Sequence, residues 1–384
     1  MRLHEFEAKQ LFARQGIVVP RGTVTALPEE ASDIAAAMDA VTVIKAQVLA
    51  GGRGKAGGIR TAATAADAER CTAEIMASSI RGLIPESVLI EEQLDIAREL
   101  YLGITIDSAA GCPAVVVSGR GGVDIETVAA EDPKAIASGH VDPLNSLSLD
   151  QACELVAAIG IEEEQISPVA DVLCRLYKLF TSCDALIAEI NPLAVLTDGS
   201  LVAADAVVEI DDAALFKHPE WNPLERIADP RSRQAKQQGM TFVELPEGDI
   251  GLICSGAGLG MATVDLIADR AGEEGGRPAN FLETGGGITR ELMASAMRLV
   301  LSQPGLKAVL INVYGGINPI HEGAKGVAEV LAEEPSVPVV AKALGNHEEE
   351  TWEILRQAGV EVVTDMATER VVEALFHRLS EEGK

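Results

Sequence analysis

A lysine and a glycine-rich segment near the start of the chain have the composition of a phosphate-binding site. Lys45 lies in an apolar run, and the sequence AGGRGKAGG follows at residues 50–58. Glycine lets backbone N–H groups approach a phosphate closely, while Arg53 and Lys55 add positive charge. The segment is not a Walker A loop, because Ala56 stands where a Ser or Thr would hold magnesium. We favour a phosphate-binding loop over the alternative, a glycine hairpin between two strands.

Acidic and amide side chains in a second region offer the oxygen atoms that magnesium prefers. Glu189 and Asn191 lie in AEINPL, and Asp205 lies in the next apolar segment, LVAADAVV. A hairpin of two apolar strands would bring the three side chains together beside bound phosphates. Without further context, buried carboxylates that are only hydrogen-bonded explain this pattern equally well.

The segment LIEEQLDIAREL carries Glu91, Glu92 and Glu99 after an apolar run. At the end of a strand, such carboxylates can accept hydrogen bonds from the sugar or the base of a nucleotide. Taken alone, the segment is more typical of a solvated acidic face.

Three glycine-rich turns in the C-terminal third each follow an apolar run. They are ICSGAGLGM from residue 253, FLETGGGITREL from residue 281 and VLINVYGGINPIHEGAKGV from residue 309. The third predicts a helix with Asn318 at its N-cap and Pro319 at its first position, where free N–H groups bind anions. Three such turns in one sheet favour a shared pocket for a phosphate or an acyl phosphate.

The six histidines show no metal-ligand spacing along the sequence. Each is therefore expected to be an ordinary surface or core residue. His321 stands out only because it lies at the predicted helix start.

Two kinds of α/β pattern follow each other along the chain. In the first half, apolar runs alternate irregularly with helical stretches, unlike a simple parallel α/β domain. From residue 250 onward, five apolar runs are each followed by a helical segment, which predicts a doubly wound parallel sheet. Ligand sites in such a sheet lie at the carboxyl ends of the strands. Prolines and mixed charges at 215–247 indicate a connector between the two parts.

Composition limits the class of protein. The chain has 384 residues, enough for two or three domains, and its 47% hydrophobic content excludes a disordered protein. The formal net charge of −28 disfavours binding to nucleic acid. The six cysteines form no Cys-x-x-Cys pair, and no stretch approaches the ~18 uncharged apolar residues of a membrane span. We therefore expect a soluble, cytoplasmic protein without a nucleic-acid or membrane partner.

In this order, the motifs resemble the β-subunit family of the NDP-forming succinate–CoA ligases (succinyl-CoA synthetases) over nearly the whole chain. The matching segments are LHEFEAKQLFARQGIVVPRG, KAQVLAGGRGKAGG, DIARELYLG, GGVDIE, EINPL, GGGITRE and NVYGGI. The resemblance implies an acid–thiol ligase of the α/β class. An ATP-grasp domain would occupy 1–235, with its small lobe at about 20–95. A connector at 236–247 would lead to a flavodoxin-like CoA-ligase domain with a parallel sheet at 248–384.

The resemblance also implies roles for individual residues. Glu189 matches the carboxylate that steadies a phosphohistidine near the nucleotide. The other implied sites are nucleotide binding at Lys45, Gly52, Arg53, Gly54, Glu91, Leu94 and Glu99, magnesium binding at Asn191 and Asp205, and binding of the acid substrate at Ser255, Gly316, Ile317 and Asn318.

Activity in this family implies a partner α subunit, which binds CoA and carries the phosphohistidine in a Gly-His-Ala-Gly segment that this chain lacks. Phosphate would pass from Mg-ATP to the histidine and then to the acid. CoA would convert the resulting acyl phosphate into the thioester. ATP or GTP as the nucleotide, and an αβ or α₂β₂ assembly, remain open alternatives.

The expected acid site departs from the family pattern. Ser255 replaces the first residue of the family's Asn-Gly-Ala-Gly, and residues 318–321 differ from the family's usual Val/Thr-Arg-Cys-Asp region. Succinate is the first expectation for the acid, and malate or another carboxylic acid is the second. A stand-alone ATP-grasp carboxylate ligase and a non-catalytic subunit are the competing hypotheses. The C-terminal α/β domain argues against the former, and the retained Lys45, Asn191 and Asp205 argue against the latter.

Overall fold

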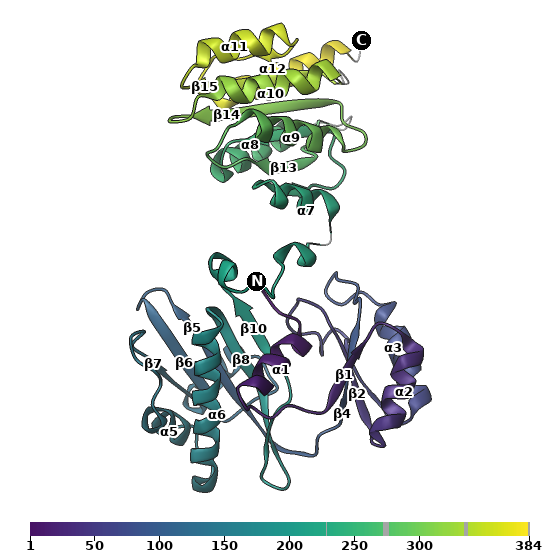
Figure 1. The fold of residues 1–384 in the computed structure, drawn as a ribbon, viewed down its shortest axis with the longest axis vertical. Coiled ribbons are helices and arrows are strands. Elements are labelled where there is room, and N and C mark those ends of the chain that lie inside the picture. Colours follow the sequence, from purple (N-terminus) through teal and green to yellow (C-terminus); the bar gives the residue numbers. More distant parts are fainter. Residues whose placement is uncertain (228, 272–275, 334–336, 383–384) are drawn as a thin grey trace. The chain divides into compact units, whose positions relative to one another are not determined.

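The computed structural model describes residues 1–227, 229–271, 276–333 and 337–382 (Figure 1). The chain forms two compact units, an N-terminal unit of residues 1–221 and a C-terminal unit of residues 222–384. Within the described ranges, no helix combines the length and the apolar character that crossing a bilayer requires.

The small lobe of the N-terminal unit is a four-stranded antiparallel sheet in the order β1-β4-β2-β3, with two helices packed on it. Its elements are β1 (Gly22–Thr25), α2 (Pro28–Met38), β2 (Thr42–Ala46), β3 (Ile59–Ala62), α3 (Ala65–Met76) and β4 (Val88–Glu92). Alanines of α2 and α3 pack against Ile44 and Ile90 of the sheet. On the paired strands β2 and β4, Lys45 stands opposite Leu89, two residues from Glu91, so Lys45 and Glu91 share one face.

The larger sheet of the N-terminal unit is also antiparallel, in the order β10-β8-β5-β6-β7, with β9 beside β8. Its strands are β5 (Ile96–Asp107), β6 (Cys112–Ser118), β7 (Ile136–His140), β8 (Ala185–Leu196), β9 (Leu201–Ala203) and β10 (Val207–Ile210). The helices of this part are α1 (Glu5–Arg14), α4 (Ile125–Glu131), α5 (Leu149–Ala157) and α6 (Glu163–Ser182). Leu173 and Leu176 of α6 belong to the core under this sheet. Figure 1 shows α1 between the two sheets.

The C-terminal unit confirms the predicted doubly wound sheet. Its strands are β11 (Thr241–Glu244), β12 (Ile250–Cys254), β13 (Asn280–Glu283), β14 (Ala308–Gly315), β15 (Val339–Gly345) and β16 (Glu361–Val362), in the order β11-β13-β12-β14-β15-β16. The five strands from β12 onward are parallel and have the flavodoxin-like order. That order reverses between β12 and β14, where a ligand crevice forms in such folds.

Helices cover both faces of this sheet. The core on one face contains residues of α9 (Arg290–Leu301), α10 (Ile320–Glu333) and α11 (Glu348–Gln357), and the core on the other contains residues of α8 (Ala257–Arg270) and α12 (Thr368–Glu382). Two short helices, η3 (Pro223–Arg226) and α7 (Pro230–Gln237), precede β11. Because the central strands β12, β14 and β15 are buried on both sides, they read as nearly continuous apolar runs in the sequence.

The segment 236–247 differs from the connector that the sequence analysis expected. Residues 241–244 form β11, which pairs antiparallel with β13 at the edge of the C-terminal sheet. Phe242 is buried in the core there, and β11 covers the backbone groups that β13 would otherwise expose. The division between the compact units falls after Trp221, so residues 222–235 group with the C-terminal unit.

Candidate active site

Two charged side chains of α1 point into the protein interior. Glu5 and Lys9 lie one turn apart on the face that also carries Ala8 and Phe12, and they are only 4% and 5% exposed. A buried charge is stable only when it is paired and hydrogen-bonded. The partners of these two residues therefore define a polar centre inside the N-terminal unit.

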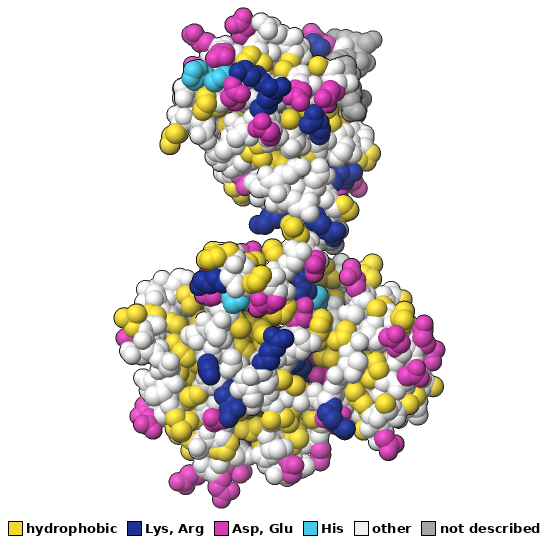
Figure 2. Space-filling view, viewed as in Figure 1, with side chains coloured by type: hydrophobic (Ala, Val, Ile, Leu, Met, Phe, Trp, Pro, Cys, Tyr) yellow, Lys and Arg dark blue, Asp and Glu magenta, His cyan; other side chains and the backbone are white. Residues whose placement is uncertain are grey.

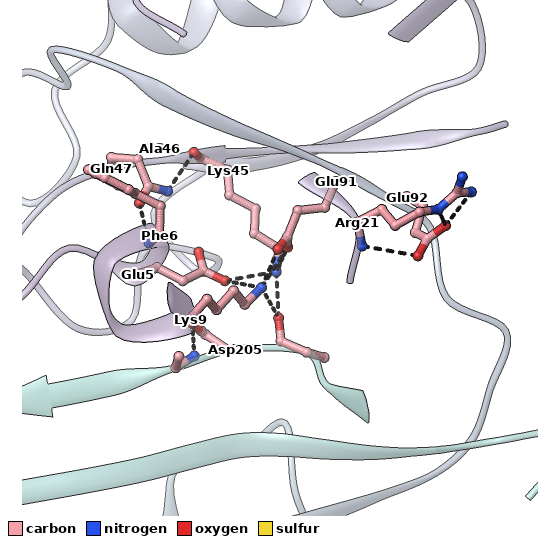
Figure 3. Close-up of polar contacts among 12 residues, drawn as sticks. Glu5, Phe6, Lys9, Arg21, Lys45, Ala46, Gln47, Glu91, Glu92 and Asp205 are labelled. Atoms are coloured by element: carbon pink, nitrogen blue, oxygen red, sulfur yellow. Dashed lines mark hydrogen bonds and ion pairs between the residues drawn. The ribbon is translucent and has the colours of Figure 1, made fainter. Parts of the chain in front are cut away.

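Three cationic and three acidic side chains form this centre, which we call the ion cluster; Figure 3 labels its lysines, glutamates and aspartate. Its members are Glu5, Lys9, Lys45, Arg53, Glu91 and Asp205. Lys9 Nζ lies 2.5 Å from Glu91 Oε1 and 2.8 Å from Glu5 Oε1. Lys45 Nζ lies 2.7 Å from Glu91 Oε2 and 3.0 Å from Glu5 Oε1. The two lysines and two glutamates thus form a closed ring of charges.

The backbone between β9 and β10 completes the ring. The carbonyl oxygen of Ala204 accepts hydrogen bonds from Lys9 Nζ at 2.8 Å and from Lys45 Nζ at 2.6 Å. Asp205 follows directly, and its Oδ1 accepts from Arg53 Nη2 at 2.7 Å. Residues far apart in the sequence therefore meet at one point, where the small lobe, α1 and the larger sheet come together.

The glycine-rich segment folds so that its arginine points into the ion cluster. Arg53 is 8% exposed, pairs with both Glu5 and Asp205, and donates from Nη1 to the carbonyl oxygen of Ala46 at 3.1 Å. Gly52 has a positive φ of 70°, and a Cβ there would lie 2.8 Å from the guanidinium of Arg81. The backbone conformation at this position therefore favours glycine, and a larger residue would also displace the end of the Arg81 side chain.

Charge balance sets the protonation of the ion cluster. Burial alone would raise the pKa of Glu5, but the positive charges of Lys45, Lys9 and Arg53 together hold it well below its ordinary value. Burial alone would lower the pKa of Lys45, but Glu5, Glu91 and Asp205 raise it. Both side chains are therefore charged near neutral pH, and the three cations offset the three carboxylates.

Two further expected site residues stand on β8. Glu189 is half-buried, and the hydroxyl of Tyr101 donates to its Oε2 at 3.4 Å. Burial and, to a smaller extent, the charge of Asp205 raise the pKa of Glu189, although hydrogen bonds from Asn191 and Tyr101 oppose the rise. Asn191 Oδ1 accepts from the backbone N–H of Gly122 at 2.8 Å. The strand thus presents a carboxylate and an amide oxygen in neighbouring positions on one face.

The remaining nucleotide positions lie outside the ion cluster. Leu94 is half-buried in the link between β4 and β5, and Glu99 is exposed on β5. Glu99 lies against Gly122, where a Cβ would come within 2.2 Å of Glu99 Oε2. Gly54 is exposed in the glycine-rich segment. Of these three, Glu99 lies beside the loop whose Gly122 contacts Asn191.

Sequence analysis missed Glu5, Lys9 and Tyr101 as parts of this centre. The signal for the first two was present, because Glu5, Ala8, Lys9 and Phe12 have the spacing of one buried helical face. Charged residues at apolar positions of such a face indicate a buried polar site. For Tyr101 the sequence offers no comparable signal, since its contact with Glu189 depends on the pairing of β5 with β8.

The C-terminal unit gathers the residues expected to bind the acid at the carboxyl ends of its strands. Ser255 follows β12, and its Oγ accepts from the backbone N–H of Tyr314 at 2.7 Å and donates to the Tyr314 carbonyl at 3.2 Å. Gly316, Ile317 and Asn318 follow β14, and Ile317 is fully open to solvent. Both loops therefore flank the point where the strand order reverses.

The start of α10 differs from the expected one. The helix begins at Ile320, so Asn318 is not its N-cap. The amide of Asn318 instead donates to the carbonyl oxygen of Gly286, in the glycine-rich turn after β13. The reason is that the turn after β13 brings an unpaired carbonyl within reach. The amide thereby joins two of the three glycine-rich turns.

Comparison with known proteins shows which family this chain belongs to. Residues 2–195 match the ATP-grasp domain family, and residues 253–375 match the CoA-ligase family. The "Succinate--CoA ligase [ADP-forming] subunit beta" of Chloroflexus aurantiacus is 43% identical over 353 residues, covering 91% of this chain and 92% of the relative. This chain belongs to the β-subunit family of the succinate–CoA ligases. The "Succinate--CoA ligase [GDP-forming] subunit beta" of Thermus thermophilus is 44% identical over 358 residues, with 92% of this chain and 93% of the relative covered.

Membership of the succinate–CoA ligase family confirms two expectations from the sequence, the acid–thiol ligase class and the order of the two domains. Among solved structures, the ATP citrate lyase of Methanothrix soehngenii in complex with citrate and coenzyme A has a TM-score of 0.78. The match covers 98% of this chain and 99% of that chain at 20% sequence identity. This likeness concerns the fold.

We predict that Glu5→Gln destabilises the N-terminal unit by about 3–5 kcal/mol, because it leaves three buried cations facing two carboxylates. Urea denaturation monitored by hydrogen exchange would report the free energy of unfolding of this unit separately. Glu29→Gln is the matched control, since Glu29 is exposed in the first turn of α2 and should change stability by less than about 0.5 kcal/mol. Equal stability of the two variants would mean that the ion cluster contributes little to the fold.

The lowered pKa of Glu5 also predicts an acid dependence. A carboxylate with a depressed folded-state pKa stabilises the protein above its unfolded-state pKa, and this stabilisation is lost as pH falls through the folded-state value. Between pH 6 and 3, the free energy of unfolding should therefore fall more steeply in the wild type than in Glu5→Gln. Parallel curves, measured by the same urea titrations, would show that Glu5 does not titrate in this way.

Proposed function

We propose that this chain is the catalytic β subunit of an ADP-forming succinate–CoA ligase that acts with an α subunit carrying the phosphohistidine and the CoA site. The ion cluster is the observation that carries the proposal. It joins Lys45 and Arg53, the expected phosphate ligands, to Asp205, an expected magnesium ligand. Relatives 40–44% identical to this chain are named as this subunit, and one of them is named as GDP-forming. ATP is therefore our first choice of nucleotide and GTP the second.

Asn191 and Asp205 are suited to hold magnesium, because each offers a hard side-chain oxygen and both belong to neighbouring segments of the larger sheet. When bound, magnesium supplies charge neutralisation to the phosphates. Positioning and electrostatics provide most of the catalysis in phosphoryl transfer. The contribution of this chain is therefore to hold the phosphates beside fixed positive charges.

Binding of a nucleotide requires an exchange of partners in the ion cluster. Arg53 pairs with Asp205 and Glu5, and Lys45 pairs with Glu5 and Glu91. Because the positive and negative charges of the cluster already offset one another, a bound phosphate must replace a carboxylate as the partner of at least one cation. Arg53 is the group placed to move, since it belongs to the glycine-rich segment, whereas Lys45 is fixed within β2. Movement of Arg53 away from the cluster would free the carboxylate of Asp205 to bind magnesium.

Glu189 would receive the phosphocarrier histidine of the α subunit. A half-buried carboxylate can accept a hydrogen bond from one ring nitrogen of an imidazole and thereby orient the other toward the phosphate. Tyr101 fixes the carboxylate through its hydroxyl at 3.4 Å. Tyr101 is therefore a positioning residue for Glu189 in this proposal.

The acid would bind at the carboxyl ends of β12 and β14. The hydroxyl of Ser255 is already bonded to the backbone of Tyr314 on both sides, as donor and as acceptor. Donors for a substrate carboxylate must then come from the backbone N–H groups of Gly316 and Ile317 and from the amide of Asn318. Because this differs from the family pattern, an acid with an additional polar group, such as malate, is the alternative to succinate.

Asp205→Ala should lower the rate of phosphate transfer from Mg-ATP to the α-subunit histidine by about 100-fold or more, since it removes an oxygen that would hold magnesium. The measurement is labelled phosphate on the α subunit in the reconstituted complex. Asp198→Asn is the matched control, because Asp198 lies in the exposed turn between β8 and β9 and bonds only Ser200 among the described residues. Wild-type transfer by Asp205→Ala would place the nucleotide site elsewhere.

Asn318→Ala should raise the KM for the preferred acid by about tenfold while leaving the KM for ATP nearly unchanged, because a lost hydrogen bond to a charged group costs about 1.5–3 kcal/mol. A panel of succinate, malate and other carboxylic acids, assayed with the α subunit and Mg-ATP, identifies that acid. Unchanged kinetics with every acid would exclude the start of α10 from the acid site.

A further inference from the structure

Two histidines and a glutamate, none of which has a role assigned above, meet at the surface of the C-terminal unit. His321 lies in the first turn of α10, His347 immediately precedes α11, and Glu350 lies in the first turn of α11. One ligand atom from each lies within 4.8 Å of the others. The rings of His321 and His347 have centroids 4.6 Å apart, and Figure 2 shows a patch of histidine on this unit.

One nitrogen of this group has no hydrogen-bond partner. Nδ1 of His321 is buried and unpaired within the part of the chain that the structure describes. The other ring nitrogen, Nε2, lies 3.2 Å from Oε1 of Glu322. A carboxylate close to one ring nitrogen favours the proton on that nitrogen and leaves the lone pair of the other available for a metal.

The backbone holds the three ligands in place without a metal. Asn346, next to His347, donates its N–H to the carbonyl of Gly315 at 2.9 Å and accepts from the N–H of Ile320 at 3.2 Å. Its side-chain amide donates to the carbonyl of Ile317 at 3.3 Å. Asn346 thus joins the loop after β15 to the end of β14, to the loop that follows it and to the start of α10. A set of ligands fixed in this way loses little entropy on binding an ion.

We propose that His321, His347 and Glu350 form a binding site for one divalent transition metal ion of the Zn²⁺ type. Two imidazole nitrogens and one carboxylate oxygen suit Zn²⁺, Co²⁺ or Ni²⁺, whereas Mg²⁺ prefers an all-oxygen set. Glu322, whose Oε1 lies 3.2 Å from Nε2 of His321, would serve as the outer carboxylate. Three protein ligands leave coordination positions for water or a substrate oxygen. The ion would cross-link the starts of α10 and α11 beside residues 316–318. The proposal does not depend on the function proposed above.

The test uses the full chain, freed of metal by chelation and titrated with Co²⁺ in the presence of excess Mg²⁺. We expect one Co²⁺ per chain, bound with the visible bands of nitrogen and oxygen ligation. The sulfur-to-cobalt charge-transfer band of a cysteine site should be absent. Failure to bind Co²⁺ under these conditions, or a spectrum of cysteine ligation, would overturn the proposal.

Variants locate the ion. His347→Asn preserves the left-handed backbone of this residue, because asparagine tolerates φ near +63°, and should weaken Co²⁺ binding by at least about tenfold. Glu322→Gln removes the outer carboxylate and should weaken it by about 10–100-fold. His377→Asn is the matched control, since His377 is exposed on α12 and should leave binding unchanged.

A chain with His347→Asn that still binds Co²⁺ like the wild type would also overturn the site. Hydrogen exchange of the loop at 316–318 gives a second readout. Co²⁺ should slow exchange there in the wild type and in His377→Asn, but not in His321→Gln. Slowing in all three proteins would place the ion elsewhere.

Discussion

The N-terminal unit is organised around a balance of buried charge. Three cations and three carboxylates, supplied by α1, β2, the glycine-rich segment, β4 and the link between β9 and β10, offset one another inside the unit. None of these groups is stable in the interior without the others, because a single unpaired buried charge costs several kcal/mol. The position of α1 and the closeness of the two sheets both follow from this requirement.

In the function proposed above, the same balance would let a stable core serve also as a binding site. A cluster of well-packed apolar residues would hold the two sheets together equally well, but it could not exchange partners with a phosphate. Here Arg53 is the one cation carried by a loop, whereas Lys9 and Lys45 belong to a helix and a strand. The charges on the helix and the strand therefore maintain the fold, and the charge on the loop is the one that the proposed function would exchange.

Much of the architecture follows from sequence patterns, and the exceptions have physical causes. The apolar runs from residue 250 onward predict the parallel sheet because strands buried on both faces have few polar positions. Lys45, Arg53 and Asp205 could be singled out by residue type and spacing. Glu5 and Lys9 were overlooked, because charged residues at two positions of the buried face of α1 interrupt its apolar pattern. The short strand β11 was also missed, because four residues with a single buried side chain, Phe242, carry too little periodicity.

The histidine group illustrates a different limit. His321 and His347 are separated by a helix and a strand, so no spacing rule connects them, and only the parallel order of β14 and β15 brings the two loops together. Contacts of this kind depend on topology. The sequence determines such contacts only by determining the order of all the strands in the sheet.

The first residues of the chain have a consequence for its synthesis. The N–H of Leu3 donates to the carbonyl of Val208, and the N–H of Ile210 donates to the carbonyl of Met1, so the beginning of the chain is fixed to β10. A ribosome adds residues from the N-terminus, and domains generally fold as units as they emerge. Glu5 and Lys9 are therefore translated about two hundred residues before the strand that anchors them. The contacts of Met1 and Leu3 with β10 can therefore form only after the last strand of the unit has left the exit tunnel.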